Sequence, residues 1–188
     1  WVLASGDQLD ETAPGAAGSC YARNKARADA MIPPLAQHAG VAWINLRLFN
    51  TFGRYESPTR LVPTLVAKLS RGEAVSLTHG DQIRDFNDVD VVASAFVAAL
   101  ALPETACNAL YHIGSGRGTS VRDLALGVAD FFGMPELVQF GAVGAQDDDV
   151  PCLVANPMLA RTRLGWEPKP DLEARVRAVV AWWLERPN

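Results

Sequence analysis

A tyrosine and a lysine four positions apart, Tyr21 and Lys25, are the residues of this sequence with the clearest chemical use. On a helix, this spacing puts both side chains on one face, with the lysine about one turn further along. A phenol with a pKa near 10 is a poor acid or base at neutral pH, and a neighbouring ammonium group favours its phenolate form. The pair therefore predicts a tyrosine that gives or takes a proton with the help of a lysine.

Ser5 lies sixteen residues before Tyr21, at the end of a short apolar segment. A hydroxyl at that place would hold a carbonyl or alcohol oxygen of a substrate beside the tyrosine. Ser5, Tyr21 and Lys25 together would move a proton while a hydride passes to or from a nicotinamide. The pair alone also fits a surface helix with an extended lysine, so the hypothesis depends on the rest of the chain.

The elements that must position these residues alternate between strands and helices. The predicted strands are residues 2–4, 41–49 (buried), 74–78 and 110–113, and the predicted helices are residues 21–32, 59–71, 88–102, 120–132 and 172–184. Pro33 and Pro34 are expected to break or kink the first helix, and Gly72 to end the second. Ser120, with Asp123 three residues later, is expected to cap the fourth. This alternation predicts α/β architecture with parallel strands.

The composition narrows the classes of protein that the sequence fits. With 188 residues, 49% of them hydrophobic and 20% charged, the chain can bury a core. A net charge of −4 without a basic stripe argues against nucleic acid as a partner. No apolar run approaches the roughly 20 residues of a membrane helix.

The cysteines and histidines predict neither a disulfide framework nor a metal site. The three cysteines are widely spaced, and no CxxC pair or Cys/His cluster accompanies them. The three histidines lack carboxylates at ligand spacing, so we expect them to be satisfied or solvated. The start of the chain lacks the charged region of a signal peptide, and we expect a cytoplasmic protein.

Several further blocks follow Ser5 and the Tyr21–Lys25 pair in order. They are RLFNTFG at residues 47–53, LVP at 61–63, GDQIRDFNDVDV at 80–91, YHIGSG at 111–116 and LGWEP at 164–168. Together they resemble the extended short-chain dehydrogenase/reductases, the NAD-dependent epimerase/dehydratase group that acts on nucleotide-linked sugars. The resemblance covers essentially the whole chain, and the ordered set is more specific than any single block.

The resemblance implies a role for each matching residue. Ser5, Tyr21 and Lys25 match the catalytic serine and YxxxK of the family. Tyr21 and Lys25 are also implied to contact the cofactor, NAD or NADP, together with Leu48 and Phe49.

The nucleotide-sugar is implied to bind at Asn50, Leu61, Leu77 and Arg84. In the family, the arginine of the RDF block contacts the diphosphate or ribose of the substrate, which suits a planar bidentate cation. No metal is implied.

The resemblance also implies the domain organisation. Residues 1–50 correspond to the C-terminal part of a Rossmann-type NAD(P)-binding domain with a parallel sheet. Residues 51–188 correspond mainly to a smaller α/β substrate-binding region, with some segments returning to the Rossmann domain. The family's glycine-rich phosphate loop lies on its first strand, and nothing like it precedes Ser5. We therefore expect the chain to begin inside a fold and, as given, to hold NAD(P) weakly or not at all.

Three functions remain open from the sequence. Oxidation or reduction at a sugar carbon, of the 4-ketoreductase or epimerase type, is favoured. Asp7 stands two places after Ser5, where sugar dehydratases carry an acid, so a 4,6-dehydratase is an alternative, although a turn residue fits Asp7 as well. Gln146 stands where a second phosphate-binding arginine is expected, which leaves a non-catalytic relative that binds a nucleotide-sugar or a protein partner. A homodimer through the helix of Tyr21 and Lys25 is a further expectation.

Overall fold

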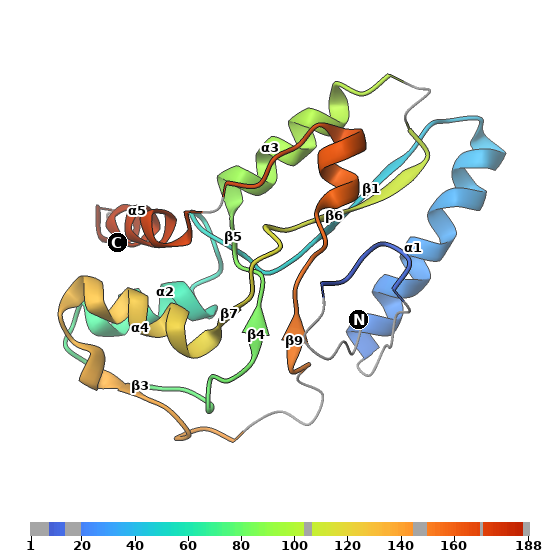
Figure 1. The fold of residues 1–188 in the computed structure, drawn as a ribbon. Helices are drawn as coiled ribbons and strands as arrows, with labels where there is room; N and C mark the ends of the chain where they lie inside the picture. The colour runs from blue at the N-terminus through green and yellow to red at the C-terminus, as the bar shows by residue number, and fades with distance from the viewer. Residues whose placement is uncertain (1–7, 14–19, 104–106, 145–149, 170, 186–188) are drawn as a thin grey trace.

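The computed structural model describes residues 8–13, 20–103, 107–144, 150–169 and 171–185. Two strands, β1 (Ile44–Leu48) and β6 (Ala109–Ile113), pair in parallel with Ile44 opposite Ala109 and Leu48 opposite Ile113. The helices α1 (Cys20–Ala39) and α3 (Val89–Leu100) lie on either side of this pair (Figure 1). The predicted α/β architecture with parallel strands is confirmed.

The remaining strands have two residues each. In parallel pairs, β2 (Thr51–Phe52) lies beside β5 (Asn87–Asp88), and β3 (Val75–Ser76) lies beside β8 (Val138–Gln139). A three-stranded sheet places β4 (Ile83–Arg84) between β7 (Thr119–Ser120), which is antiparallel to it, and β9 (Cys152–Leu153), which is parallel. Two short helices are the 3-10 helix η2 (Pro135–Leu137) and the π-helix η3 (Ala160–Leu164).

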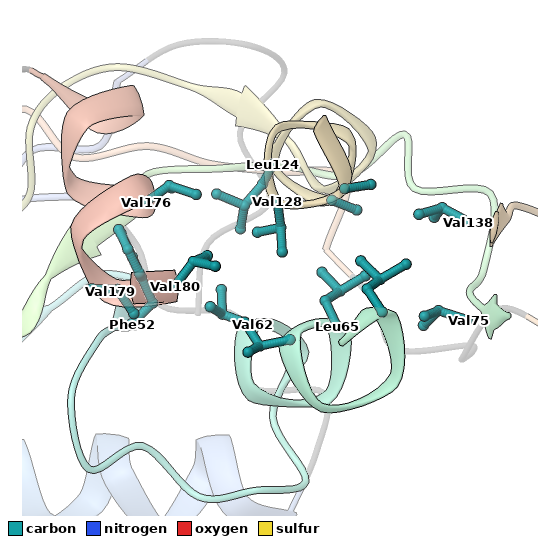
Figure 2. Close-up of a cluster of buried hydrophobic side chains, with 14 residues drawn as sticks. Phe52, Val62, Leu65, Val75, Leu124, Val128, Val138, Val176, Val179 and Val180 are labelled. Carbon is teal, nitrogen blue, oxygen red and sulfur yellow. The ribbon is translucent and has the colours of Figure 1, made fainter. Parts of the chain in front are cut away.

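Three helices enclose the larger core. In Figure 2, side chains of α2 (Leu61–Leu69), α4 (Val121–Phe132) and α5 (Leu172–Glu185) point toward one another. Val62, Leu65, Val128 and Val180 are each at most 1% exposed. These apolar residues recur at helical spacing in the sequence, so burying one face of each helix stabilises all three.

The start of α4 follows its predicted signal. The Ser120 side chain accepts a hydrogen bond from the backbone N–H of Asp123 at 2.9 Å and caps α4. The helix α2 ends at Leu69 with Ser70 as its C-cap, before the predicted end at residue 71. Gly72 lies in the turn that follows, with a φ of +67°, and its N–H donates to the Leu69 carbonyl at 3.0 Å. A positive φ of this size favours glycine, which has no Cβ to clash.

The helix α1 does not end before Pro33 and Pro34 but continues through both to Ala39. The expectation that it stops near residue 32 is therefore wrong. Each proline lacks the N–H that would bond to the carbonyl four residues earlier, on Asp29 and Ala30. Both prolines lie exposed on the surface, so water can hydrate those carbonyls.

The strand β1 is half-buried, whereas a buried strand was expected. Within the described ranges it pairs along one edge, with β6. The side chains of Ile44 and Leu46 in β1 line an open apolar groove together with Phe96 and Leu100 of α3. The division of the chain at residue 50 stays a prediction, although the pairing of β6 with β1 brings a late segment back to the first sheet.

No helix in the described part of the chain is long and apolar enough to cross a membrane.

Candidate active site

A carboxylate on α1 anchors this helix to β1. Arg47 Nε donates to Asp29 Oδ2 at 2.7 Å, and Asn45 Nδ2 donates to Asp29 Oδ1 at 3.1 Å. All three side chains are at least partly buried, so solvent screens the ion pair less than it would at an open surface. The helix that carries Tyr21 and Lys25 therefore has a set position against the strand that leads to Asn50.

Tyr21 and Lys25 lie side by side near the start of α1. The Lys25 Nζ atom is 5.7 Å from the centroid of the Tyr21 ring. Tyr21 is 68% exposed, and Lys25 is exposed as well. The two side chains are thus adjacent and open to a ligand, whereas Ser5 and Asp7 lie outside the described residues.

The two residues expected to meet the nicotinamide differ in their surroundings. Leu48, the last residue of β1, is 42% exposed and is open to a ligand. Phe49 is buried, and its ring packs edge-on against His112 with the centroids 5.3 Å apart. The Phe49 side chain thus faces the interior, and its backbone N–H already donates to the Ile113 carbonyl.

A cleft of about 290 Å³ brings together three of the four residues expected to bind the substrate, Asn50, Leu61 and Arg84. Asn50 lies between β1 and β2, Leu61 is the first residue of α2, and Arg84 is the last residue of β4. We call this cleft the substrate cleft. Leu77 is not part of it, because the Leu77 side chain packs against the core between α2 and α4. The other lining residues are Thr51, Phe52, Glu56, Thr59, Arg60, Val62, Gln82, Phe86, Val121 and Leu124.

Backbone pairing holds the polar residues of the substrate cleft in place. The backbone N–H of Asn87 donates to the carbonyl of Asn50 at 2.8 Å, where β2 and β5 meet. Arg84 is 8% exposed, and its Nη1 atom donates to the Ile83 carbonyl at 2.8 Å. A buried guanidinium with this anchor offers an anion a cation of fixed position.

Sequence reasoning missed Glu56, a carboxyl group of the substrate cleft. Its side chain is 14% exposed, and Oε1 lies 3.6 Å from Arg60 Nε. Oε2 is buried and has no hydrogen-bond partner among the described residues. Burial raises the pKa of Glu56 above its usual value, although the Gly53 N–H and Arg60 act against this shift. Glu56 falls between the predicted strand at residues 41–49 and the predicted helix at residues 59–71, and no motif marks it.

Asp85, the neighbour of Arg84, was also missed, and it is fully buried. Its Oδ1 accepts hydrogen bonds from the N–H and hydroxyl of Ser115 and from Asn87 Nδ2. Its Oδ2 accepts from the N–H groups of Gly116 at 2.9 Å and Ala155 at 3.1 Å. Asp85 therefore joins β4 to two distant segments. The RDF block, which the family resemblance already marks, was the available signal.

His112 lies at the buried end of β6, close to Phe49. Its Nδ1 atom is 2.9 Å from the Leu9 carbonyl, and its backbone N–H donates to Glu11. Burial lowers the pKa of His112, against the opposing effect of the Leu9 carbonyl and Glu11. The described residues contain no group of three or more His, Cys, Asp or Glu side chains that could hold a metal ion.

The chain is similar in sequence and in fold to known enzymes. CDP-abequose synthase of Salmonella muenchen is 26% identical over 145 residues, covering 77% of this chain and 49% of the relative. The dTDP-L-rhamnose 4-epimerase of Burkholderia thailandensis is 35% identical over 142 residues, covering 73% and 38%. The crystal structure of dTDP-glucose 4,6-dehydratase from Bacillus anthracis, in complex with NAD, superposes with a TM-score of 0.88 at 22% identity, covering 98% and 58%.

The matched part covers between 38% and 58% of the length of these proteins, and the structural likeness concerns the fold. The model of the family described as "NAD dependent epimerase/dehydratase family" matches residues 3–114, which is more than half of the chain. The matched segment contains the Tyr21–Lys25 pair and all three predicted substrate residues of the cleft. The chain belongs to the NAD-dependent epimerase/dehydratase family.

Proposed function

We propose that this chain carries the acid/base and substrate-binding part of an NAD(P)-dependent enzyme that oxidises or reduces a sugar carbon of a nucleotide-sugar, of the 4-ketoreductase or epimerase type. The observation that carries the proposal is the substrate cleft, which collects Asn50, Leu61 and Arg84 from three separate segments. Family membership supports it, and the relatives named above are a synthase, an epimerase and a dehydratase of nucleotide-linked sugars.

Tyr21 is the proposed acid and base. In the reducing direction, its phenol O–H gives a proton to the carbonyl oxygen while the carbonyl carbon receives a hydride. In the oxidising direction, the phenolate takes the proton of the sugar hydroxyl as the hydride leaves. The ammonium group of Lys25 stabilises the negative charge on the phenolate, and Ser5 is proposed to hold the reacting oxygen.

NAD or NADP, when bound, supplies or accepts the hydride. The exposed side chains of Tyr21, Lys25 and Leu48 suit contact with such a group. Phe49 fits this role less well, because its ring is buried against His112. Cofactor contact by these residues, a homodimer and a cytoplasmic location all stay predictions.

The substrate cleft suits one end of an anionic sugar nucleotide. The guanidinium of Arg84 is proposed to bind the diphosphate, and the Asn50 side chain to hydrogen-bond with the sugar or phosphate. Leu61 supplies apolar surface at the start of α2. A cleft of about 290 Å³ lies at the lower limit of typical small-molecule sites, so part of a nucleotide-sugar is expected to extend beyond it.

The test is cofactor oxidation and reduction by the longest form of the protein that the gene encodes. The panel contains UDP-, dTDP-, CDP- and GDP-linked hexoses and their 4-keto derivatives. Tyr21→Phe should lower turnover by roughly 10²- to 10⁴-fold, because it removes the proton that the reaction needs. Tyr55→Phe is the matched control, because it removes the same hydroxyl from another exposed tyrosine and keeps the ring that packs on Trp182.

The same panel separates the other functions. Release of water with formation of a 4-keto-6-deoxy sugar would identify a dehydratase. Tight binding of a nucleotide-sugar without any turnover would identify a binding protein and overturn the proposal.

A further inference from the structure

We propose that the chain has a second binding site, for a small phosphate-type anion such as pyrophosphate, separate from the substrate cleft. The site is a cleft of about 230 Å³ between the β5–α3 junction and the start of α5. Arg117, Lys169 and Arg175 line it, and we call it the basic cleft. Nothing in the proposed reaction uses these three residues.

The three cations come from three different segments. Arg117 follows the Ser115–Gly116 turn, Lys169 lies in the segment before α5, and Arg175 lies in the first turns of that helix. Within the described part of the chain, none of the three side chains makes an ion pair. Three positive charges that lack ion-pair partners around one cleft repel one another, and a bound anion would relieve that repulsion.

The nearby carboxylates are engaged elsewhere. Asp88 also lines the basic cleft, but it is buried and its Oδ1 accepts from the Asp90 N–H at 2.7 Å as the cap of α3. Asp171 Oδ1 accepts from the Ala174 N–H at 3.0 Å at the start of α5. Three cations therefore face one capping carboxylate in the lining, and the cleft favours a ligand of negative charge.

The basic cleft is distinct from the substrate cleft. Phe86 lines both, while Arg84 lines only the substrate cleft and Arg117 and Arg175 line only the basic one. The segment from β4 to β5 thus forms a wall between the two. A volume of about 230 Å³ is below the roughly 300–1,000 Å³ of sites for drug-sized molecules, so the ligand is a small anion or the anionic end of a larger molecule.

The test is calorimetric titration of the 188-residue chain with inorganic pyrophosphate at low ionic strength. The double variant Lys169→Gln/Arg175→Gln should weaken binding by about tenfold or more, because it removes two charged hydrogen-bond donors. The double variant Arg71→Gln/Arg177→Gln is the matched control. It removes the same net charge from arginines that are paired with Glu73 and Glu173, and it should change affinity less than about twofold.

A third variant, Arg84→Gln, removes the proposed diphosphate contact of the substrate cleft. Pyrophosphate binding that remains in this variant, and that Lys169→Gln/Arg175→Gln removes, belongs to the basic cleft. Absence of binding by the unmodified chain would overturn the proposal. So would complete loss of binding in Arg84→Gln, which would place all of the pyrophosphate in the substrate cleft, or an equal loss in the matched control, which would indicate non-specific attraction. Thermal unfolding checks that each variant is folded. If the double variant is unfolded, the single variant Arg117→Gln takes its place in the titration with pyrophosphate.

Discussion

Asp85 Oδ1 accepts hydrogen bonds from both the backbone N–H and the hydroxyl of Ser115, at 2.9 and 2.6 Å. The other carboxylate oxygen accepts from Gly116 and Ala155. One buried side chain thus joins β4 to the turn after β6 and to the segment after β9. Arg84 is the last residue of β4 and directly precedes Asp85. The hydrogen bonds of Asp85 therefore also hold Arg84 at the substrate cleft.

Asp85→Asn should lower the free energy of unfolding by about 2–4 kcal/mol, because the new amide NH₂ must face groups that are themselves donors. Urea unfolding measures this change. Asp81→Asn is the control, since Asp81 is 80% exposed and lies 3.8 Å from Arg122, and it should change stability by less than about 1 kcal/mol. Equal effects of the two variants would contradict the role of Asp85.

Gly114→Ala should destabilise the protein, because an added Cβ would lie 2.5 Å from Asp85 Oδ2 and 2.6 Å from the Ala155 Cβ. Overpacking of this kind costs about 1–3 kcal/mol. Gly127→Ala in α4 is the matched control, since its Cβ would meet no atom within 4 Å. That change should stabilise the helix by roughly 0.5–1 kcal/mol. A thermal scan giving shifts of the same sign would argue against the close approach.

Glu56→Gln should change how stability depends on pH. Burial raises the pKa of Glu56 in the folded state, so the native protein holds this proton more tightly than the unfolded chain. The stability that Glu56 contributes is therefore full below its unfolded pKa of about 4.5 and declines as pH rises through the higher folded value. Unfolding measured from pH 4 to pH 7 should show Glu56→Gln gaining stability relative to the unmodified chain as pH rises.

Glu73→Gln is the control for this effect and should have the opposite slope. The hydrogen bond from Arg71 lowers the pKa of Glu73, so its contribution is present above the unfolded pKa and is lost as pH falls. Parallel slopes for the two variants would show that burial of Glu56 does not govern its titration.

Arg84→Gln should weaken binding of UDP or dTDP to the 188-residue chain by roughly 10- to 100-fold, because it removes the charged donor that is proposed to bind the diphosphate. Calorimetry with each nucleoside diphosphate measures the change. Arg71→Gln, at an exposed arginine paired with Glu73, should leave the affinity as it is. Unchanged binding in Arg84→Gln would remove the arginine from the proposed site.

The presence of the helices, and the start of α4, could be predicted from the sequence because their signals are local. Ser120 and Asp123 lie within one turn of each other, and Gly72 lies three residues after Leu69, the last residue of α2. The order of the family blocks likewise depends only on the chain. The length of α1 was misjudged, since whether a proline ends a helix depends on whether water or protein surrounds the carbonyls that it leaves unpaired.

The sequence by itself determined the fold class, the family and the Tyr21–Lys25 spacing, because periodicity and spacing are written along the chain. Only the tertiary structure decided which distant residues meet. It placed Asn50, Leu61 and Arg84 in one cleft without Leu77, and it bonded Asp85 to Ser115, thirty residues away. Such contacts depend on how segments with no sequence relationship pack, and this packing also decides which carboxyl groups lose water.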